Sequence, residues 1–581
     1  MRLSNYDKTP SIRIEGEATT GWKSICLRLK QFKRISGQRR CVIVFELYTG
    51  THYHEIITAV GLLNPVLIIE SGKAFLSEEK IRELTWPDIT DDDIFGYMTR
   101  LQMTDFLDQD AVKSLQNEIN AVQEGIVVVV GTGASLVAKN YDLLVYADMA
   151  RWEIQKRMKR SEVYGLGIDD SRLPFSQQYK RGYFVDWRVC DRHKKDLFPK
   201  MDFILDTHQK GEPKMIDAGL MFNALKKTAM QPFRVVPYFD PGPWGGQWMK
   251  EVCDLDKNEI NFAWCFDCVP EENSLLLNIS GTMFEIPSVN LVFCESGNLL
   301  GEPVEARFGQ EFPIRFDFLD TMDGGNLSLQ VHPDTRYIRD KFGMQYTQDE
   351  SYYLLDAKED ATVFLGLRSG VNPQEMITAL QVAQNGGAPF DAERFVNRFP
   401  AKKHDHFLIP AGTVHCSGAN CMVLEISATP YIFTFKMWDW GRPGLDGNPR
   451  PINIDHAANV IRWERDTGYA RKDLVNCIEP IAQGDGWREE RTGFHKDEFI
   501  ETRRHCFSEK VYHSTFESVN VINLVEGDEA IVESIDNQFE PFVVHYAETF
   551  IVPAAVKEYT IRPFGESEGK EIVTIKAFVR L

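Results

Sequence analysis

The spacing of apolar residues changes near residue 230 of this 581-residue chain, and the two sides of that point follow different periodicities. Before it, continuous apolar runs such as CVIVFELY (41–48) and GIVVVVGTGA (125–134) alternate with turns and helical stretches. This alternation predicts a parallel sheet with covering helices. After it, short β-rich runs are separated by Gly, Pro, Asn and Asp, a pattern typical of a β-sandwich or barrel. The chain is therefore predicted to be a multidomain protein, since it is also too long for one core.

Three domains are expected from this pattern. The first is an α/β parallel-sheet domain at 1–228. The second is a β-barrel at 229–475 that carries a helical insertion at 373–398, where Asn372 can cap the helix and the proline after it fits the first helical position. The third, at 476–581, repeats the β pattern more weakly and is expected to be a barrel without metal ligands.

Charge and composition exclude several classes of partner. The net charge of −20 argues against nucleic acid and anionic membranes, because both would repel the chain. The sequence contains no apolar run near the ~20 residues of a membrane span, and its first residues have no apolar signal segment, so a cytoplasmic protein is expected. Eleven cysteines are too sparse for a disulfide scaffold and are expected to be reduced. The oligomeric state is left open.

Two separated segments, LSLQVHPD (327–334) and FLIPAGTVH (407–415), each place a histidine at the end of an apolar run. Glu350 lies between them in the sequence, and Gln330 is two residues before His332, so both side chains would share one face of a strand. Imidazole, carboxylate and amide groups together suit a borderline divalent ion such as Zn²⁺. A histidine at a strand end is more often structural, so the residues alone leave both readings open.

Five segments in order resemble the type I phosphomannose isomerases. They are LSLQVHPD, DESYYLLDA, FLIPAGTVH, MVLEIS and TFKMWDWGR. The resemblance covers residues 235–581, with the last part similar to that family's C-terminal cupin. It implies two cupin barrels, a zinc ion held by Gln330, His332, Glu350 and His415, and a small-molecule sugar or sugar phosphate as partner. It also implies interconversion of mannose 6-phosphate and fructose 6-phosphate through a cis-enediol.

The chain departs from the family pattern at two places that concern the substrate. Gln348 and Asp349 stand where the family has Lys-Thr, and Lys436 stands where it has an arginine. Lysine keeps the charge but loses the planar, two-pronged donor. Lys436 is nevertheless expected to be the proton-transferring group, with a pKa lowered by burial, and Glu350 is the second expected catalytic residue.

Substrate contacts are expected from Lys436, Asp439, Arg442, Gln348 and Arg339. Arg339 lies with Arg336 and Lys341 in the segment after His332, and for these three a solvated surface is the favoured reading. The alternative function is a non-catalytic metal-containing cupin that binds a sugar or sugar phosphate as a sensor or regulator.

The region 1–228 resembles a P-loop nucleoside or nucleotide kinase whose phosphate loop is degenerate. A working loop needs G-x-x-x-x-G-K-[ST], but ELYTGTHYHE (46–55) has one glycine, Gly50, and no lysine. A kinase-like fold without ATP hydrolysis or a bound cofactor is therefore expected. The basic helix at 151–160 is expected to be a solvated or interdomain face.

Overall fold

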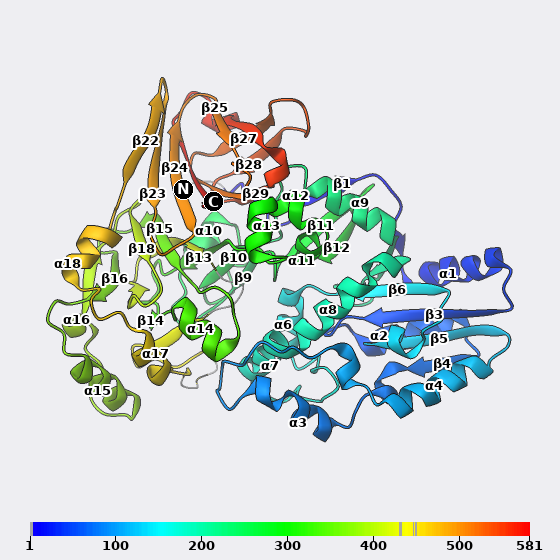
Figure 1. Cartoon of the computed structure of the whole chain (residues 1–581). Coiled ribbons are helices and arrows are strands. Elements are labelled where there is room, and N and C mark those ends of the chain that lie inside the picture. Colours follow the sequence, from blue (N-terminus) through cyan, green and yellow to red (C-terminus); the bar gives the residue numbers. More distant parts are fainter. Residues whose placement is uncertain (1–3, 429–432, 446, 448–449) are drawn as a thin grey trace. The chain divides into compact units, whose positions relative to one another are not determined.

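The computed structural model describes residues 4–428, 433–445, 447 and 450–581 and divides the chain into two compact units (Figure 1). Unit 1 comprises Met1–Pro10, Lys227–Asn273 and Leu291–Leu581, and unit 2 comprises Ser11–Lys226 and Ser274–Asn290. The chain is thus multidomain with mixed sheets, as predicted. Among the helices of the described residues, none combines the length and apolar character that a membrane crossing requires.

Unit 2 is built on a seven-stranded sheet with the order β2-β8-β7-β6-β3-β5-β4. Five adjacent strands are parallel: β3 (Arg40–Leu47), β4 (Leu67–Glu70), β5 (Gly125–Gly131), β6 (Leu143–Asp148) and β7 (Phe203–Asp206). The edge strands β8 (Lys214–Asp217) and β2 (Thr19–Thr20) are antiparallel. Residues 127–130 are valines with no exposed surface, because helices cover both faces of a parallel sheet.

The helices of unit 2 connect these strands. A parallel pair needs a long crossover, and the chain supplies helices between successive strands. They include α1 (Trp22–Ser36), α2 (Tyr53–Val60), α3 (Glu78–Ile89), α4 (Gln109–Ala121), α6 (Arg151–Lys159) and α8 (Trp187–Leu197). In α6, Arg151 and Arg157 are buried rather than solvated. Their guanidinium groups bind within unit 2, which explains how a helix of this charge enters the interior.

A three-stranded sheet in unit 2 joins distant parts of the sequence. The hairpin β11 (Ser274–Ile279) and β12 (Thr282–Pro287) pairs with β1 (Ser11–Ile14), and β1 and β11 run parallel. The residues after the hairpin are anchored by Asn290, whose Nδ2 donates to Asp148 Oδ2 at 2.8 Å. This contact satisfies part of a buried carboxylate at the end of β6, so the hairpin belongs structurally to the α/β unit.

Unit 1 contains two pairs of antiparallel sheets. The first pair consists of a six-stranded sheet, β18-β15-β20-β13-β10-β9, and a five-stranded sheet, β17-β16-β19-β14-β21. The strands of the six-stranded sheet are β9 (Tyr238–Asp240), β10 (Trp264–Cys268), β13 (Arg315–Asp320), β15 (Glu350–Ala357), β18 (His406–Ile409) and β20 (Cys421–Ser427). Those of the five-stranded sheet are β14 (Leu329–Val331), β16 (Thr362–Leu367), β17 (Val396–Pro400), β19 (His415–Ser417) and β21 (Phe435–Trp438).

The helical insertion occupies most of the segment predicted for it. Asn372 caps α15 (Pro373–Gln384) through a hydrogen bond from Glu375 N, and α16 (Ala392–Phe395) follows. The last residues of the predicted insertion instead begin β17, because Val396 and Asn397 are buried against β16.

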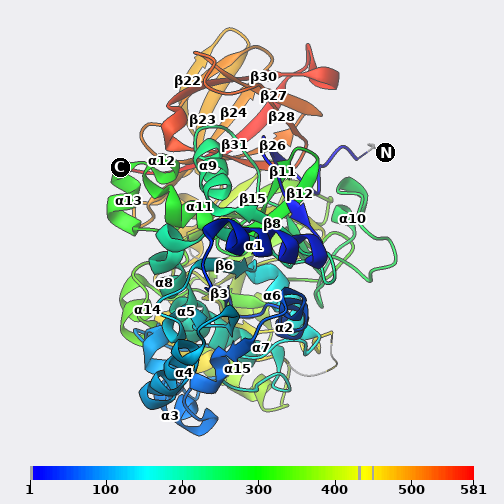
Figure 2. The ribbon, with the colours of Figure 1, turned by 90° about the vertical axis from the view of Figure 1, so that its right-hand side faces the viewer.

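The second pair of sheets contains the C-terminal strands, which lie together in both views (Figure 1, Figure 2). One sheet has the order β22-β23-β24-β31-β26-β29 and the other the order β25-β30-β27-β28. The first comprises β22 (Glu479–Gly484), β23 (Trp487–Gly493), β24 (Ile500–Phe507), β26 (Asn520–Glu526), β29 (Thr549–Val552) and β31 (Ile572–Val579). The second comprises β25 (Val511–Ser514), β27 (Glu529–Ser534), β28 (Phe542–His545) and β30 (Glu558–Pro563). Closure of either pair into a barrel stays a prediction.

A buried arginine joins the two pairs of sheets within unit 1. Arg234 Nη1 lies 2.6 Å from Glu548 Oε1, and Nη2 lies 3.7 Å from Asp267 Oδ1, with all three side chains almost fully buried. The same guanidinium donates to the carbonyl oxygens of Asp7 at 2.9 Å and Thr549 at 3.2 Å. One cation therefore ties the N-terminal segment, the first pair of sheets and the second pair together.

Replacing Arg234 by Ala is expected to destabilise unit 1 by about 3–5 kcal/mol, because two buried carboxylates lose their cation. Arg398→Ala removes a solvent-exposed pair with Glu393 and is expected to cost no more than about 1 kcal/mol. Urea unfolding followed by tryptophan fluorescence measures both variants. Equal midpoints for the two would contradict a structural role for the Arg234 cluster.

Candidate metal and substrate site

Strand register brings three of the predicted metal ligands together at β14. Gln330 is paired directly with His415 on β19, and His332 follows the last residue of β14. Because Gln330 and His332 are two residues apart, their side chains lie on one face of the sheet. Glu350 comes from the other sheet, where it is the first residue of β15 and pairs with Ile409 and Ser427. The two sheets therefore contribute different donor types to one centre.

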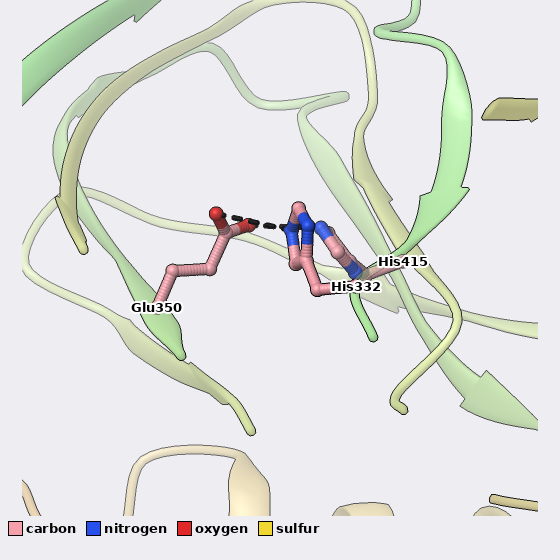
Figure 3. Close-up of side chains that lie close together, drawn as sticks. All are labelled: His332, Glu350 and His415. Atoms are coloured by element: carbon pink, nitrogen blue, oxygen red, sulfur yellow. Dashed lines mark ion pairs between the residues drawn. The ribbon is translucent and has the colours of Figure 1, made fainter. Parts of the chain in front are cut away.

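The donor atoms of this centre are close together and buried (Figure 3). His415 Nε2 lies 2.8 Å from Glu350 Oε1, and His332 Nε2 lies 3.2 Å from Glu350 Oε2. The amide nitrogen of Gln330 lies 3.3 Å from His415 Nε2, so a turn of the amide about its last bond brings its oxygen to the same centre. The two imidazoles and the carboxylate have essentially no exposed surface.

Backbone carbonyls orient both imidazoles. His332 Nδ1 is 2.9 Å from Phe433 O, and His415 Nδ1 is 2.9 Å from Thr413 O. A carbonyl oxygen only accepts, so each Nδ1 carries a proton and each Nε2 is directed at Glu350. Outer hydrogen bonds of this kind fix the tautomer of a metal-binding histidine.

A divalent ion fits this set of donors. His332 Nε2 and Glu350 Oε1 are buried and make no hydrogen bond within the described part of the chain. Donors bound to one Zn²⁺ at roughly 2.1 Å are about 3.4 Å from one another in a tetrahedron, close to the 2.8–3.3 Å separations found here. Among the described residues, His332, Glu350 and His415 are the one group of three or more His, Cys, Asp or Glu side chains that meets this condition.

The ionisation of Glu350 follows from its neighbours. Burial alone would raise its pKa, but His332 and His415 outweigh burial and hold the pKa well below its usual range. Glu425 is also close, and burial raises its pKa well above the usual value, with Glu350 as the next cause. The centre is thus an ionised carboxylate beside a carboxyl group that remains protonated.

The two residues before Glu350 point in opposite directions. Gln348 Nε2 donates to Glu350 Oε2 at 2.9 Å, and Gln348 Oε1 accepts from Phe433 N at 2.9 Å. Gln348, predicted as a substrate contact, therefore orients the carboxylate in this structure. Asp349 faces away, where its Oδ1 accepts from Ala411 N at 2.8 Å and burial raises its pKa to about 6.

Lys436 lies next to the centre on the other neighbour of β14. It pairs directly with Gln330, and directly opposite residues on antiparallel strands share a face. Burial, with a smaller contribution from the nearby Arg450, lowers its pKa to about 7. Its amine is therefore partly uncharged near neutral pH, and its role in proton transfer stays a prediction.

Two arginines and Asp439 form a cluster beside Lys436. Asp439 Oδ1 accepts from Arg442 Nη2 at 2.9 Å and from Ser328 Oγ at 2.8 Å. Its Oδ2 lies 3.0 Å from Arg450 Nη1. Arg450 was not predicted, because it follows Asp439 by eleven residues across a Gly- and Pro-rich linker. The only hint in the sequence was a second arginine at the end of the linker that begins with Arg442.

Arg339 is placed elsewhere. It lies on α14 (Thr335–Phe342), and its side chain is 58% exposed and 3.7 Å from Asp340. Arg336 is 87% exposed and also faces Asp340. In this structure both cations lie on an exposed helix face, whereas Arg442 and Arg450 are largely buried beside Asp439.

The second pair of sheets has a polar interior that sequence reasoning missed. His505 on β24 and His513 on β25 lie with ring centres 4.6 Å apart, and His513 stacks on Tyr559 at 5.2 Å. His505 Nε2 is 3.1 Å from Glu489 Oε1. Lys576 is buried nearby, and burial lowers its pKa to about 8. The two histidines lie on strands of different sheets, so the sequence did not indicate that their rings are in contact.

Comparisons with known proteins cover different parts of the chain. A family model described as a domain of unknown function (DUF8485) matches residues 21–230. The mannose-6-phosphate isomerase of Streptococcus mutans is 26% identical over 222 residues, which is 38% of this chain and 64% of that protein. The putative mannose-6-phosphate isomerase YvyI of Bacillus subtilis is 24% identical over 342 residues, which is 57% of this chain and 96% of that protein.

Among solved structures, a mannose 6-phosphate isomerase from Bacillus subtilis aligns with a TM-score of 0.49 and 19% identity, over 60% of this chain and 99% of that one. The Streptococcus mutans match spans less than two thirds of that protein's length. Homology to mannose-6-phosphate isomerases, predicted from five sequence segments, is confirmed over part of the chain. The kinase-like resemblance of the first domain stays a prediction.

His332→Ala is expected to abolish binding of a divalent ion, because it removes one donor and leaves Glu350 with a single histidine. Metal content of the purified protein, measured by mass spectrometry, checks this. His404→Ala is the control, since His404 is about one third exposed and its side chain faces Glu526. Wild-type metal content in the His332 variant would exclude this ligand assignment.

Proposed function

We propose that unit 1 is a zinc-dependent aldose–ketose isomerase that interconverts mannose 6-phosphate and fructose 6-phosphate, or a related sugar pair, through a cis-enediol. The observation that carries the proposal is the register of β14, where Gln330 has His415 on one side and Lys436 on the other. In this register, Gln330, one of the residues that could bind a metal, lies directly opposite Lys436, whose amine is partly deprotonated. Similarity to proteins named as mannose-6-phosphate isomerases supports the choice of reaction.

Gln330, His332, Glu350 and His415 would hold the ion. Bound Zn²⁺ would supply a Lewis acid for the two substrate oxygens on C1 and C2. The protein's own contribution is rigidity. Carbonyl oxygens fix both imidazoles, and Gln348 fixes the carboxylate, so the donors need little rearrangement when the ion binds.

Lys436 would move the proton between C1 and C2. An aldose–ketose isomerisation removes a proton from one carbon and returns one to the neighbouring carbon, so one base on one face of the enediol serves both steps. Lys436 lies opposite Gln330 in the strand register, which supports an approach of its amine to the metal-binding face of the sheet. A lysine in water is almost fully protonated at neutral pH and cannot accept a proton. Burial lowers the pKa of Lys436, so that part of its amine is free to act as a base.

Arg442 and Arg450 would bind the phosphate. Both are held by Asp439, which leaves each guanidinium with further donors. Asp439 also accepts from Ser328, which is two residues before Gln330 and hence about 7 Å from it along the strand. A sugar phosphate has its reacting carbons and its phosphate at opposite ends, so it can reach from the ion to this cluster.

Purified protein supplied with Zn²⁺ is expected to form fructose 6-phosphate from mannose 6-phosphate. Arg450→Ala is expected to raise KM for the phosphorylated sugar by about tenfold or more, because a charge-assisted pair to phosphate is lost. Arg339→Ala, the control from the exposed helix face, is expected to leave KM unchanged. If metal and sugar bind but no member of a panel of hexoses, pentoses and their phosphates turns over, the protein is a sensor rather than an isomerase.

Activity is expected to rise with pH through about 7 and then level off, because Lys436 acts only when unprotonated and burial lowers its pKa to about 7. Lys436→Arg keeps a cation that does not lose its proton, so kcat is expected to fall at least ~100-fold. The pH–rate profile of the wild type and the residual activity of the variant check this. A variant that retains the wild-type profile would remove Lys436 from the mechanism.

A further inference from the structure

Unit 2 contains a cavity of about 640 Å³ at the carboxyl ends of three adjacent parallel strands, β3, β5 and β4. Leu47, Glu70 and Gly131, the last residues of those strands, line it. The walls are residues 48–55, which end in the first turn of α2, and the segments 71–76 and 162–167. Open α/β sheets bind small molecules at this edge, and the volume suits a ligand of small-molecule size.

The loop 48–53 stands where a phosphate would be cradled, yet the cation behind it is fully engaged. Arg157 Nη1 donates to Gly50 O at 2.9 Å, and Nη2 donates to Thr207 O at 3.1 Å and His208 O at 2.9 Å. Its Nε donates to Glu153 Oε1 at 2.9 Å. Arg157 therefore supports the loop from behind and has no exposed surface. Burial lowers the pKa of His52, which adds little positive charge to the cavity at neutral pH.

Three carboxylates line the same cavity: Glu55, Glu70 and Glu162. An ionised carboxylate only accepts hydrogen bonds, and a phosphate group near neutral pH also offers mainly acceptors and negative charge. The two therefore repel each other, whereas a hydroxyl group can donate to a carboxylate. Glu70 is suitably placed, since its side chain is 43% exposed. Its Oε2 accepts a hydrogen bond from Tyr53 Oη at 2.5 Å, and its Oε1 lies 3.8 Å from Nζ of Lys73, which also lines the cavity.

Aromatic and hydroxyl groups complete the lining. Tyr164 is 49% exposed, and Tyr53 presents its ring from the first turn of α2. Aromatic rings offer a flat apolar face against which the C–H face of a sugar ring can pack. Thr49, Thr51 and Thr132 add hydroxyl groups that both donate and accept. Flat apolar faces combined with acceptors and hydroxyls match a polyhydroxylated ring.

We propose that this cavity binds an unphosphorylated sugar ring, either a free sugar or the sugar part of a nucleoside, with Glu70 accepting from its hydroxyls and Tyr164 covering one face. The site lies within unit 2 and is separate from the metal-binding residues of unit 1. It does not depend on the proposed isomerase activity. The degenerate loop is then an adaptation to a neutral ligand.

Hydrogen exchange of the full-length protein tests the proposal, with D-mannose, D-glucose and adenosine as neutral probes and AMP and inorganic phosphate as anionic probes. A neutral probe is expected to protect peptides covering 48–55 and 162–167, and to do so equally in the His332→Ala variant. Protection by a hexose identifies a free sugar, and protection by adenosine alone identifies a nucleoside.

Two matched variants distinguish binding of a neutral ligand from binding of an anionic ligand. Glu70→Gln is expected to weaken binding of the neutral probe about tenfold, as loss of one charge-assisted hydrogen bond predicts. Lys210→Gln, which removes a cation lining the same cavity, is expected to leave binding unchanged. Tyr164→Ala tests the exposed ring without disturbing the Tyr53–Glu70 contact. Protection by AMP or phosphate alone, protection lost in Lys210→Gln, or no protection by any probe would overturn the proposal.

Discussion

Gln330 on β14 pairs with a residue on each neighbouring strand, with His415 on β19 and with Lys436 on β21. The strand that holds it is only three residues long, so few backbone hydrogen bonds define its register. A slip of one residue would turn Gln330 and His332 to the opposite face and separate them from Glu350. Every further feature of the site depends on that register, including the approach of Glu350 from the second sheet.

Desolvation controls the charges around this register. Water is excluded from Glu350 and from both imidazoles, so the carboxylate stays ionised only because its neighbours compensate for burial. In two nearby acids, Glu425 and Asp349, burial outweighs the neighbouring groups that lower the pKa, and their pKa values are raised. On the far side of Gln330 the same effect acts on a base, Lys436, and lowers its pKa. One low-dielectric interior thus produces an anionic centre and a partly neutral amine on adjacent strands.

Local sequence patterns predicted the parts of the molecule that depend on local interactions. The valine run of β5 and the alternating runs after residue 230 gave the sheet types, and the Asn372–Pro373 pair gave the start of α15. Long-range pairing was not predictable in the same way. Arg450 pairs with Asp439 although eleven residues separate them in sequence, and the guanidinium of Arg157 is held by carbonyls from two other loops. The hairpin at 274–287 has the periodicity of its β-rich surroundings, but its partner strand is near residue 11.

That hairpin affects the order in which the protein can fold during synthesis. β1 emerges from the ribosome first, but the strand with which it pairs is made more than 250 residues later. Asp148 likewise gains its hydrogen bond from Asn290 only after residue 290 has been synthesised. The α/β unit therefore reaches its full set of contacts only after part of unit 1 has been synthesised. The two units are interleaved along the chain, and no single cut between them leaves both complete.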